Sequence, residues 1–141
     1  MAILKFSYYP RLYFNPVSKK QIEVYRPYVP IRLAFAHHLD KDVVYCLVDS
    51  GSDRNLFPAL WGKSLGINIT KGVPVNVTGI GGHDLVAYKH NVKIYLDTFG
   101  LETEVFFTDR QKMPLLGRNG FFDKFKRVCF NETEKYLEIE K

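Results

Sequence analysis

Cysteine is scarce in this sequence. The 141 residues contain two cysteines, Cys46 and Cys129, and both lie in apolar, strand-like runs. Two cysteines at this separation indicate neither the disulfide framework of a small secreted domain nor a metal site. We therefore expect both to be small side chains of a buried core, and we expect no metal and no cofactor.

Long hydrophobic runs are also absent. No stretch approaches the roughly 20 apolar residues that a membrane-spanning helix requires. Residues 1–6 contain no sustained apolar segment of the kind found in secretory signals. We therefore expect a protein of the reducing cytoplasm that makes no membrane contact.

Extended helical patterns are missing as well. Ten glycines and seven prolines interrupt the chain, while 46% of its residues are hydrophobic, enough to form the core of a single domain. Residues 91–98 and 101–108 have the alternation of strands, and we expect them to be joined by a turn at residues 99–100. These features predict an all-β class.

Acidic residues are rare near the N-terminus. Residues 1–30 carry +4 of the net charge of +5, because Glu23 alone opposes five basic residues: Lys5, Arg11, Lys19, Lys20 and Arg26. Interleaved aromatic residues could make this segment a nucleic-acid face. We favour a strand or arm whose aromatic side chains pack on the domain, because no nucleic-acid motif accompanies the charge.

One stretch combines apolar and chemically active residues. Residues 43–48 are β-prone, and they end abruptly at Asp49, Ser50 and Gly51. A carboxylate at the end of a buried strand is costly to desolvate unless it is hydrogen-bonded or used in chemistry. Taken alone, this tripeptide is better explained as a polar turn after a strand, because three residues recur often by chance.

Two further segments are punctuated by glycine. Residues 73–78 and 83–88 are β-prone and flank residues 79–82, which predicts a hairpin with a glycine-rich tip. A phosphate-binding loop would open a helix, so we reject that interpretation. Residues 113–120 form a short apolar run that ends in glycines, and residues 58–65 and 121–126 are candidates for short helices, with Leu60 and Leu65 partly buried.

Together these segments resemble the retropepsin-like (retroviral-type) aspartic proteases, particularly their small prokaryotic relatives. Residues 47–53 resemble the catalytic loop, residues 78–82 resemble the glycine-rich flap, and residues 115–122 resemble the apolar-apolar-Gly-Arg block and its helix. The resemblance implies a closed, pepsin-type β-barrel with one or two short helices, which functions as a homodimer. It covers residues 28–141, so residues 1–27 are predicted to be an extension that serves as a pro-segment, a lid or an added strand.

The resemblance also implies an activity. The chain has one Asp-Ser-Gly, so an aspartic endopeptidase would need Asp49 from each of two subunits to activate water. It assigns Asp49, Ser50 and Gly51 to catalysis and Arg118 to structural support. It assigns contacts with a peptide or protein substrate to Ser52, Asp53, Gly79, Ile80, Gly81 and Gly82.

Two details of this interpretation concern the surroundings of the loop. Arg118 is expected to pair with Asp53, and the C-terminal hairpin, through Leu137 and Ile139, is expected to help form the dimer interface. Two other functions remain open at this point. One is a catalytically silent peptide-binding or dimerisation module of the same fold, and the other is nucleic-acid binding through the basic segment.

Overall fold

The computed structural model describes residues 2–79 and 81–141. Strands dominate, with one short α-helix, α1 (Ala59–Ser64), and two 3-10 turns, η1 (Ile69–Lys71) and η2 (Phe122–Lys124). The strands are β1 (Ile3–Ser7), β2 (Tyr9–Asn15), β3 (Lys20–Arg26), β4 (Tyr28–Phe35), β5 (His38–Leu39), β6 (Val44–Val48), β7 (Leu56–Pro58), β8 (Val73–Thr78), β9 (Asp84–Leu96), β10 (Phe99–Thr108), β11 (Leu115–Leu116), β12 (Arg127–Asn131) and β13 (Tyr136–Glu140).

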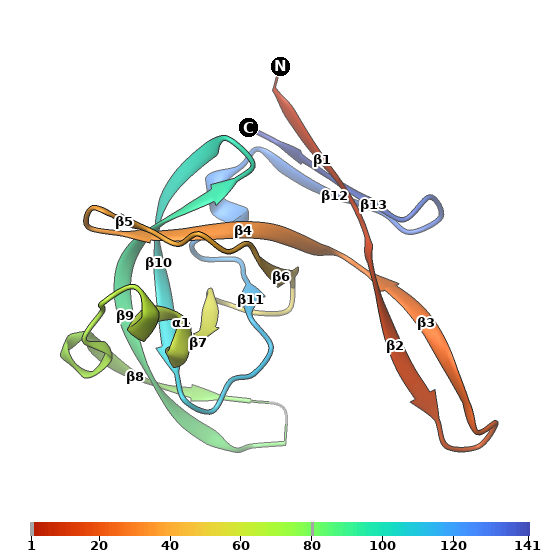
Figure 1. The fold of residues 1–141 in the computed structure, drawn as a ribbon, viewed down its shortest axis with the longest axis horizontal. Helices are drawn as coiled ribbons and strands as arrows, with labels where there is room; N and C mark the ends of the chain where they lie inside the picture. The colour runs from red at the N-terminus through yellow and green to blue at the C-terminus, as the bar shows by residue number, and fades with distance from the viewer. Residues whose placement is uncertain (1, 80) are drawn as a thin grey trace.

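A closed barrel forms the body of the molecule (Figure 1). Its six strands run in the order β4-β6-β11-β7-β10-β9, and the pairing of β4 with β9 closes the ring. Because closure leaves no free edge within the ring, the backbone hydrogen bonds of these strands are satisfied internally. The predicted all-β class and closed barrel are confirmed.

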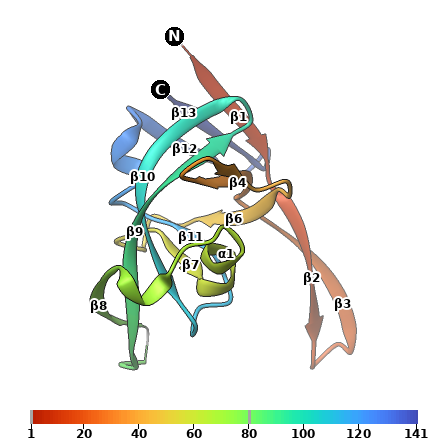
Figure 2. The ribbon, with the colours of Figure 1, turned by 60° about the vertical axis from the view of Figure 1, so that its left-hand side comes forward.

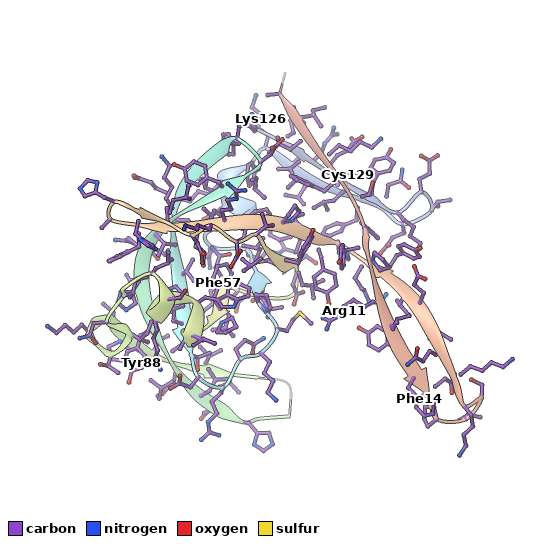
Figure 3. All side chains as sticks on the ribbon, viewed as in Figure 1. Arg11, Phe14, Phe57, Tyr88, Lys126 and Cys129 are labelled. Atoms are coloured by element: carbon purple, nitrogen blue, oxygen red, sulfur yellow. The ribbon has the colours of Figure 1, made fainter. Side chains whose placement is uncertain are left out.

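The barrel interior is filled by alternate residues of its strands. Ile94 on β9, Phe107 on β10 and Phe57 on β7 are fully buried, and Figure 3 shows Phe57 within the body. The turn between β9 and β10 lies at residues 97–98, two residues before the predicted position. Asp97 supplies the positive φ of 57° that this tight turn requires, a conformation that aspartate tolerates better than most residues.

A buried side-chain amide, that of Asn55, links the strands next to the candidate site. β11 lies between β6 and β7, parallel to the first and antiparallel to the second. Asn55, which is fully buried, accepts the Gly117 N–H at 3.0 Å and donates to the Glu104 carbonyl at 3.0 Å. This one side chain therefore links the segment after Asp49, the segment after β11 and the centre of β10.

A second sheet, of order β1-β13-β12, covers one end of the barrel. Its central strand, β13, has both edges paired within the same chain, and Leu137 and Ile139 are fully buried in the core. Leu137 and Ile139 therefore do not offer the apolar contact expected of them, because they are buried within the subunit, while a role of the C-terminal hairpin in a dimer stays a prediction. Of the three roles considered for the extension, residues 3–7 thus form an added strand.

The remaining segment of the extension is a hairpin of β2 and β3, which forms its own two-stranded sheet. It projects away from the barrel in both views (Figures 1 and 2). The division of the chain at residues 27 and 28 stays a prediction, although Tyr8, on the N-terminal side, belongs to the hydrophobic core.

Two predictions about individual residues are wrong. Cys46 is buried, and burial raises the pKa of its thiol, but Cys129 is exposed because it alternates on β12 with Val128 and Phe130, which pack on the core. Leu65, the residue that ends α1, is buried but Leu60 is exposed, because residues five apart in a helix point in different directions. No helix among the described residues is long and apolar enough to cross a membrane.

Substituting Asn55 tests the role of the strand crossing. Asn55→Ala would leave the Gly117 N–H and the Glu104 carbonyl without their partners in the interior, so we expect the free energy of unfolding to fall by about 3 kcal/mol. Urea unfolding measures this change. Asn91→Ala, at an exposed position of β9, is the control and should change stability by less than about 0.5 kcal/mol. A loss at Asn55 no larger than that of the control would contradict the assignment.

Candidate active site

The site begins where β6 leaves the barrel. Val48 is buried, and the next residue, Asp49, is half-buried, with its N–H donating to the Leu116 carbonyl at 2.9 Å. The Asp49 carboxylate accepts the Gly51 N–H at 2.9 Å, and the Asp49 carbonyl accepts the Ser52 N–H at 3.1 Å. The backbone thus turns sharply around the carboxylate and fixes the direction in which Asp49 points.

Gly51 is needed for this turn because of space. A Cβ added to Gly51 would lie 3.2 Å from the Asp49 carboxylate oxygen that its own N–H contacts. Such a contact is tighter than van der Waals packing normally allows, so a larger residue would displace either the turn or the carboxylate. Ser50, the residue between them, is exposed, and its hydroxyl is accessible from outside the subunit.

The segment after β11 braces the turn from the side. The N–H of Arg118 donates to the Ser52 carbonyl at 2.8 Å, and the N–H of Asn119 donates to the Asp53 carbonyl at 2.9 Å. Gly117 permits this approach, because a Cβ there would collide with the backbone of Arg54. The Ser52 hydroxyl donates to the Arg54 carbonyl at 2.8 Å, which tightens the same turn.

Arg118 supports the loop in a different way from the one predicted. Its Nε donates to the Ser50 carbonyl at 2.7 Å, and among the ion pairs of the described residues none joins it to Asp53. The predicted Asp53–Arg118 pair is therefore wrong. Both side chains are exposed, and an exposed ion pair gains too little to compete with a well-aligned hydrogen bond to the backbone.

The segment predicted to be the flap, to which we keep that name, is the end of the β8–β9 hairpin. The Thr78 hydroxyl donates to the Asp84 carboxylate at 2.6 Å, and the Gly79 N–H donates to the His83 carbonyl at 3.0 Å, which closes the tip. Gly81 and Gly82 have positive φ values of 96° and 77°, so the tip requires glycine at both positions. Ile80, predicted to contact substrate, lies outside the described residues.

The long strand β9 positions the flap relative to the loop. Its first half pairs with β8 in the flap, and its second half pairs with β10 and β4 in the barrel wall. The flap is therefore a continuation of a barrel strand. Both views place the end of this hairpin on the same side of the barrel as the turn between β6 and β7 (Figures 1 and 2).

Asp49 lies at an open surface of the single chain. Among the hollows of the described residues are one of about 1090 Å³ beside β4, β5, β9 and β10 and one of about 380 Å³ beside the base of the flap. Neither is lined by Asp49, and no ion pair within the described chain engages its carboxylate. The carboxylate is thus oriented by its own turn and available to a second group.

The charged group of the turn is the Asp49 carboxylate, and no metal-binding cluster of side chains is found among the described residues. The described residues contain no group of three or more His, Cys, Asp or Glu side chains that could hold a metal ion. A carboxylate with backbone N–H groups around it can carry out proton transfer and hydrogen bonding.

One residue of the site has no counterpart among the predicted functional residues. Asn55 orders both loops, yet in the sequence it follows several polar residues and has the pattern of an ordinary loop residue. The apolar residues directly after it, Leu56 and Phe57, start a buried strand, and this pattern indicates that Asn55 lies next to the core. That signal does not identify which groups the amide contacts.

The sequence comparisons and the structural comparisons differ in outcome. No family model and no curated protein matches the sequence. Among solved structures, a retropepsin-like aspartic protease from Rickettsia conorii is similar, with 13% identity, coverage of 98% of each chain and a TM-score of 0.64. EIAV protease complexed with the inhibitor HBY-793 is similar over 66% of this chain and 82% of that chain, with 19% identity and a TM-score of 0.51.

The two matches differ in how much of this chain they cover. The Rickettsia protein matches almost the whole chain, so most of the N-terminal extension has a structural counterpart there, which the sequence pattern did not reveal. The closed barrel of this chain is consistent with both matches. This chain has the fold of the retropepsin-like aspartic proteases.

Proposed function

We propose that this protein is a homodimeric aspartic endopeptidase, in which each subunit contributes Asp49. The observation that carries the proposal is the geometry of the turn. Asp49 is held at the end of a buried strand by the Gly51 and Leu116 backbone, with its carboxylate unpaired by any cation of the described chain. The Asp49 carboxylate is therefore oriented by its own turn and remains available to a second carboxyl group.

The chemistry requires two such carboxyl groups. The sequence contains one Asp-Ser-Gly, so the second carboxyl comes from a second copy across a two-fold axis. Two carboxyl groups at hydrogen-bonding distance cannot both ionise readily, and they share one proton. The ionised group takes a proton from water as it attacks the peptide carbonyl, and the protonated group donates to the carbonyl oxygen.

The substrate class follows from the surrounding backbone. An extended peptide can be held by main-chain hydrogen bonds between the flap, at Gly79, Gly81 and Gly82, and the floor, at Ser52 and Asp53. Such contacts recognise the peptide backbone and leave specificity to side-chain pockets. Closure of the flap would exclude water from the reacting bond once the substrate is bound.

Replacing the carboxylate is the first test. Asp49→Asn cannot share a proton with a second carboxyl group, so we expect a folded protein whose cleavage rate falls by at least about 10³-fold. Cleavage of a peptide library by mass spectrometry, over acid to neutral pH, measures this change. Asp42→Asn, at an exposed position before β6, is the matched control and should retain activity.

The same experiment separates the endopeptidase from the silent module. If wild-type protein cleaves no peptide of the library at any pH, the endopeptidase proposal fails. A module without turnover would then bind the same peptides with and without Asp49→Asn. Retained cleavage in Asp49→Asn, in contrast, would place the catalytic group elsewhere in the chain.

Removing Arg118 tests the brace on the loop. Arg118→Ala loses the hydrogen bond to the Ser50 carbonyl, so we expect kcat/KM to fall about tenfold, equivalent to ~1.4 kcal/mol of transition-state stabilisation. Since Arg118 is exposed, the free energy of unfolding should change by less than about 1 kcal/mol. Steady-state kinetics and urea unfolding measure the two effects, with Arg110→Ala as an exposed control. Equal kinetics in the two variants would show that the brace has no role in turnover.

Substitutions at the flap tip test its part in substrate binding. Gly82→Ala forces alanine into a left-handed conformation, at a cost of roughly 1–2 kcal/mol, so we expect KM to rise several-fold with little change in kcat. Gly66→Ala imposes comparable strain at a φ of 84°, with no atom within 4 Å and outside the flap. Because strain is matched, an equal rise in KM for Gly66→Ala would mean that the flap is not involved. Steady-state kinetics on one cleaved peptide provides the comparison.

A further inference from the structure

The hairpin of β2 and β3 carries an unusual concentration of exposed apolar side chains. We call residues 9–26 the arm. Seven large apolar side chains on it are 43–90% exposed: Tyr9, Leu12, Tyr13, Phe14, Val17, Ile22 and Tyr25. Figure 3 shows Phe14 near the far end of the arm, away from the body.

The exposed area is large for a free monomer. With side chains of roughly 200 Å² each, the seven offer about 800 Å² to solvent. This area is spread over the ribbon, and its total is similar to the about 800 Å² that each partner buries in a stable protein interface. A two-stranded ribbon is also marginally stable on its own. The arm therefore has the area of an interface and needs a partner for its own stability.

Both faces of the arm are apolar. Tyr13 and Ile22 are directly opposite each other in the register and share one face. Leu12 and Phe14 lie on the other face, and the outer edges of β2 and β3 have no strand beside them in this sheet. A partner must therefore provide cover on more than one side of the ribbon.

The base of the arm lies beside the candidate active site. The Val48 N–H, one residue before Asp49, donates to the carbonyl of Pro27, which directly follows β3. This bond is 3.0 Å long, and nearby the Tyr9 ring lies 4.4 Å from that of Tyr45 on β6. A second copy that brings its own Asp49 to this turn would arrive next to the base of the arm.

The other surface expected to join two copies is already used within the chain. β13 is paired on both edges, by β1 and β12, and the side chains of Leu137 and Ile139 lie in the core. The end sheet therefore offers neither a central strand nor these apolar side chains to another subunit. The outer edges of β1 and β12 remain unpaired in this sheet, but Leu137 and Ile139 supply no apolar contact to a second copy.

A lipid surface fits the arm less well than a second copy does. The tip carries Asn15, Ser18, Lys19 and Lys20 beside the exposed Val17 and Phe14, and further apolar residues continue along the shaft to its base. A membrane would reach the tip first and would cover one face. Two chains related by a two-fold axis offer each arm both the body and the arm of the partner.

We propose that the arm is the dimerisation element of this protein and that it docks along a second copy of the same chain. The inference rests on the proposed function for its two-fold geometry, since a half-site needs a second Asp49. The arm supplies the apolar contact, and the pairing of the two catalytic turns determines the orientation. Dimer formation thereby also buries the apolar side chains that the arm exposes in the single chain.

Substitutions on each face of the arm test the proposal. We expect Tyr13→Ser with Ile22→Ser, and separately Leu12→Ser with Phe14→Ser, to raise the dimer dissociation constant by at least about tenfold. Sedimentation velocity over a concentration series measures this constant on the full chain. Leu60→Ser with Val86→Ser removes exposed apolar side chains elsewhere and is the matched control, with an unchanged constant expected. Far-ultraviolet circular dichroism confirms that each variant is folded.

The outcomes separate this inference from the proposed function because the readout is association and not cleavage. If arm variants dissociate but wild-type protein has no proteolytic activity, the arm proposal stands and the endopeptidase fails. If wild-type protein cleaves peptides while both arm variants dimerise as wild type does, the arm proposal is overturned. A wild-type monomer at every concentration, or arm variants that lose only binding to anionic vesicles, overturns it as well.

Discussion

The arrangement of this protein depends on a buried hydrogen-bonded amide at a strand crossing. Asn55, whose own side chain is fully buried, holds the loop after Asp49 to Gly117 and to the Glu104 carbonyl. Leaving any of these groups without a partner there would cost more than the hydrogen bond itself gains. The geometry of the carboxylate turn is therefore as rigid as the barrel behind it.

The backbone around Asp49 is fixed by hydrogen bonds, whereas the carboxylate itself is not enclosed by the subunit. Backbone donors from Gly51 and Arg118 close the turn, yet Asp49 lines neither the hollow beside β4, β5, β9 and β10 nor the one beside the base of the flap. An acid that is firmly oriented but not enclosed is suited to be completed by a group from outside the subunit. The flap continues from β9 on the same side, so enclosure can come from a bound peptide and a partner together.

The N-terminal segment changes how such a partner can be recruited. β1 completes the end sheet within the chain, which removes β13 from the surfaces that another subunit could use. The segment that follows leaves the body and exposes the aromatic residues that the domain does not bury. The N-terminal extension therefore covers one edge of β13 with its first strand and exposes an apolar surface on its hairpin.

The sequence by itself determined the local features of this protein. Alternation along residues 91–98, the apolar run before Asp49 and the glycines at 79–82 predicted the strands, the carboxylate turn and the flap, because each depends on neighbouring residues. Only the tertiary structure decided the partners of Asn55 and Arg118, the burial of Leu137 and Ile139, and the exposure of the arm. These depend on which distant segments meet, and neither hydrophobic periodicity nor turn composition encodes that information.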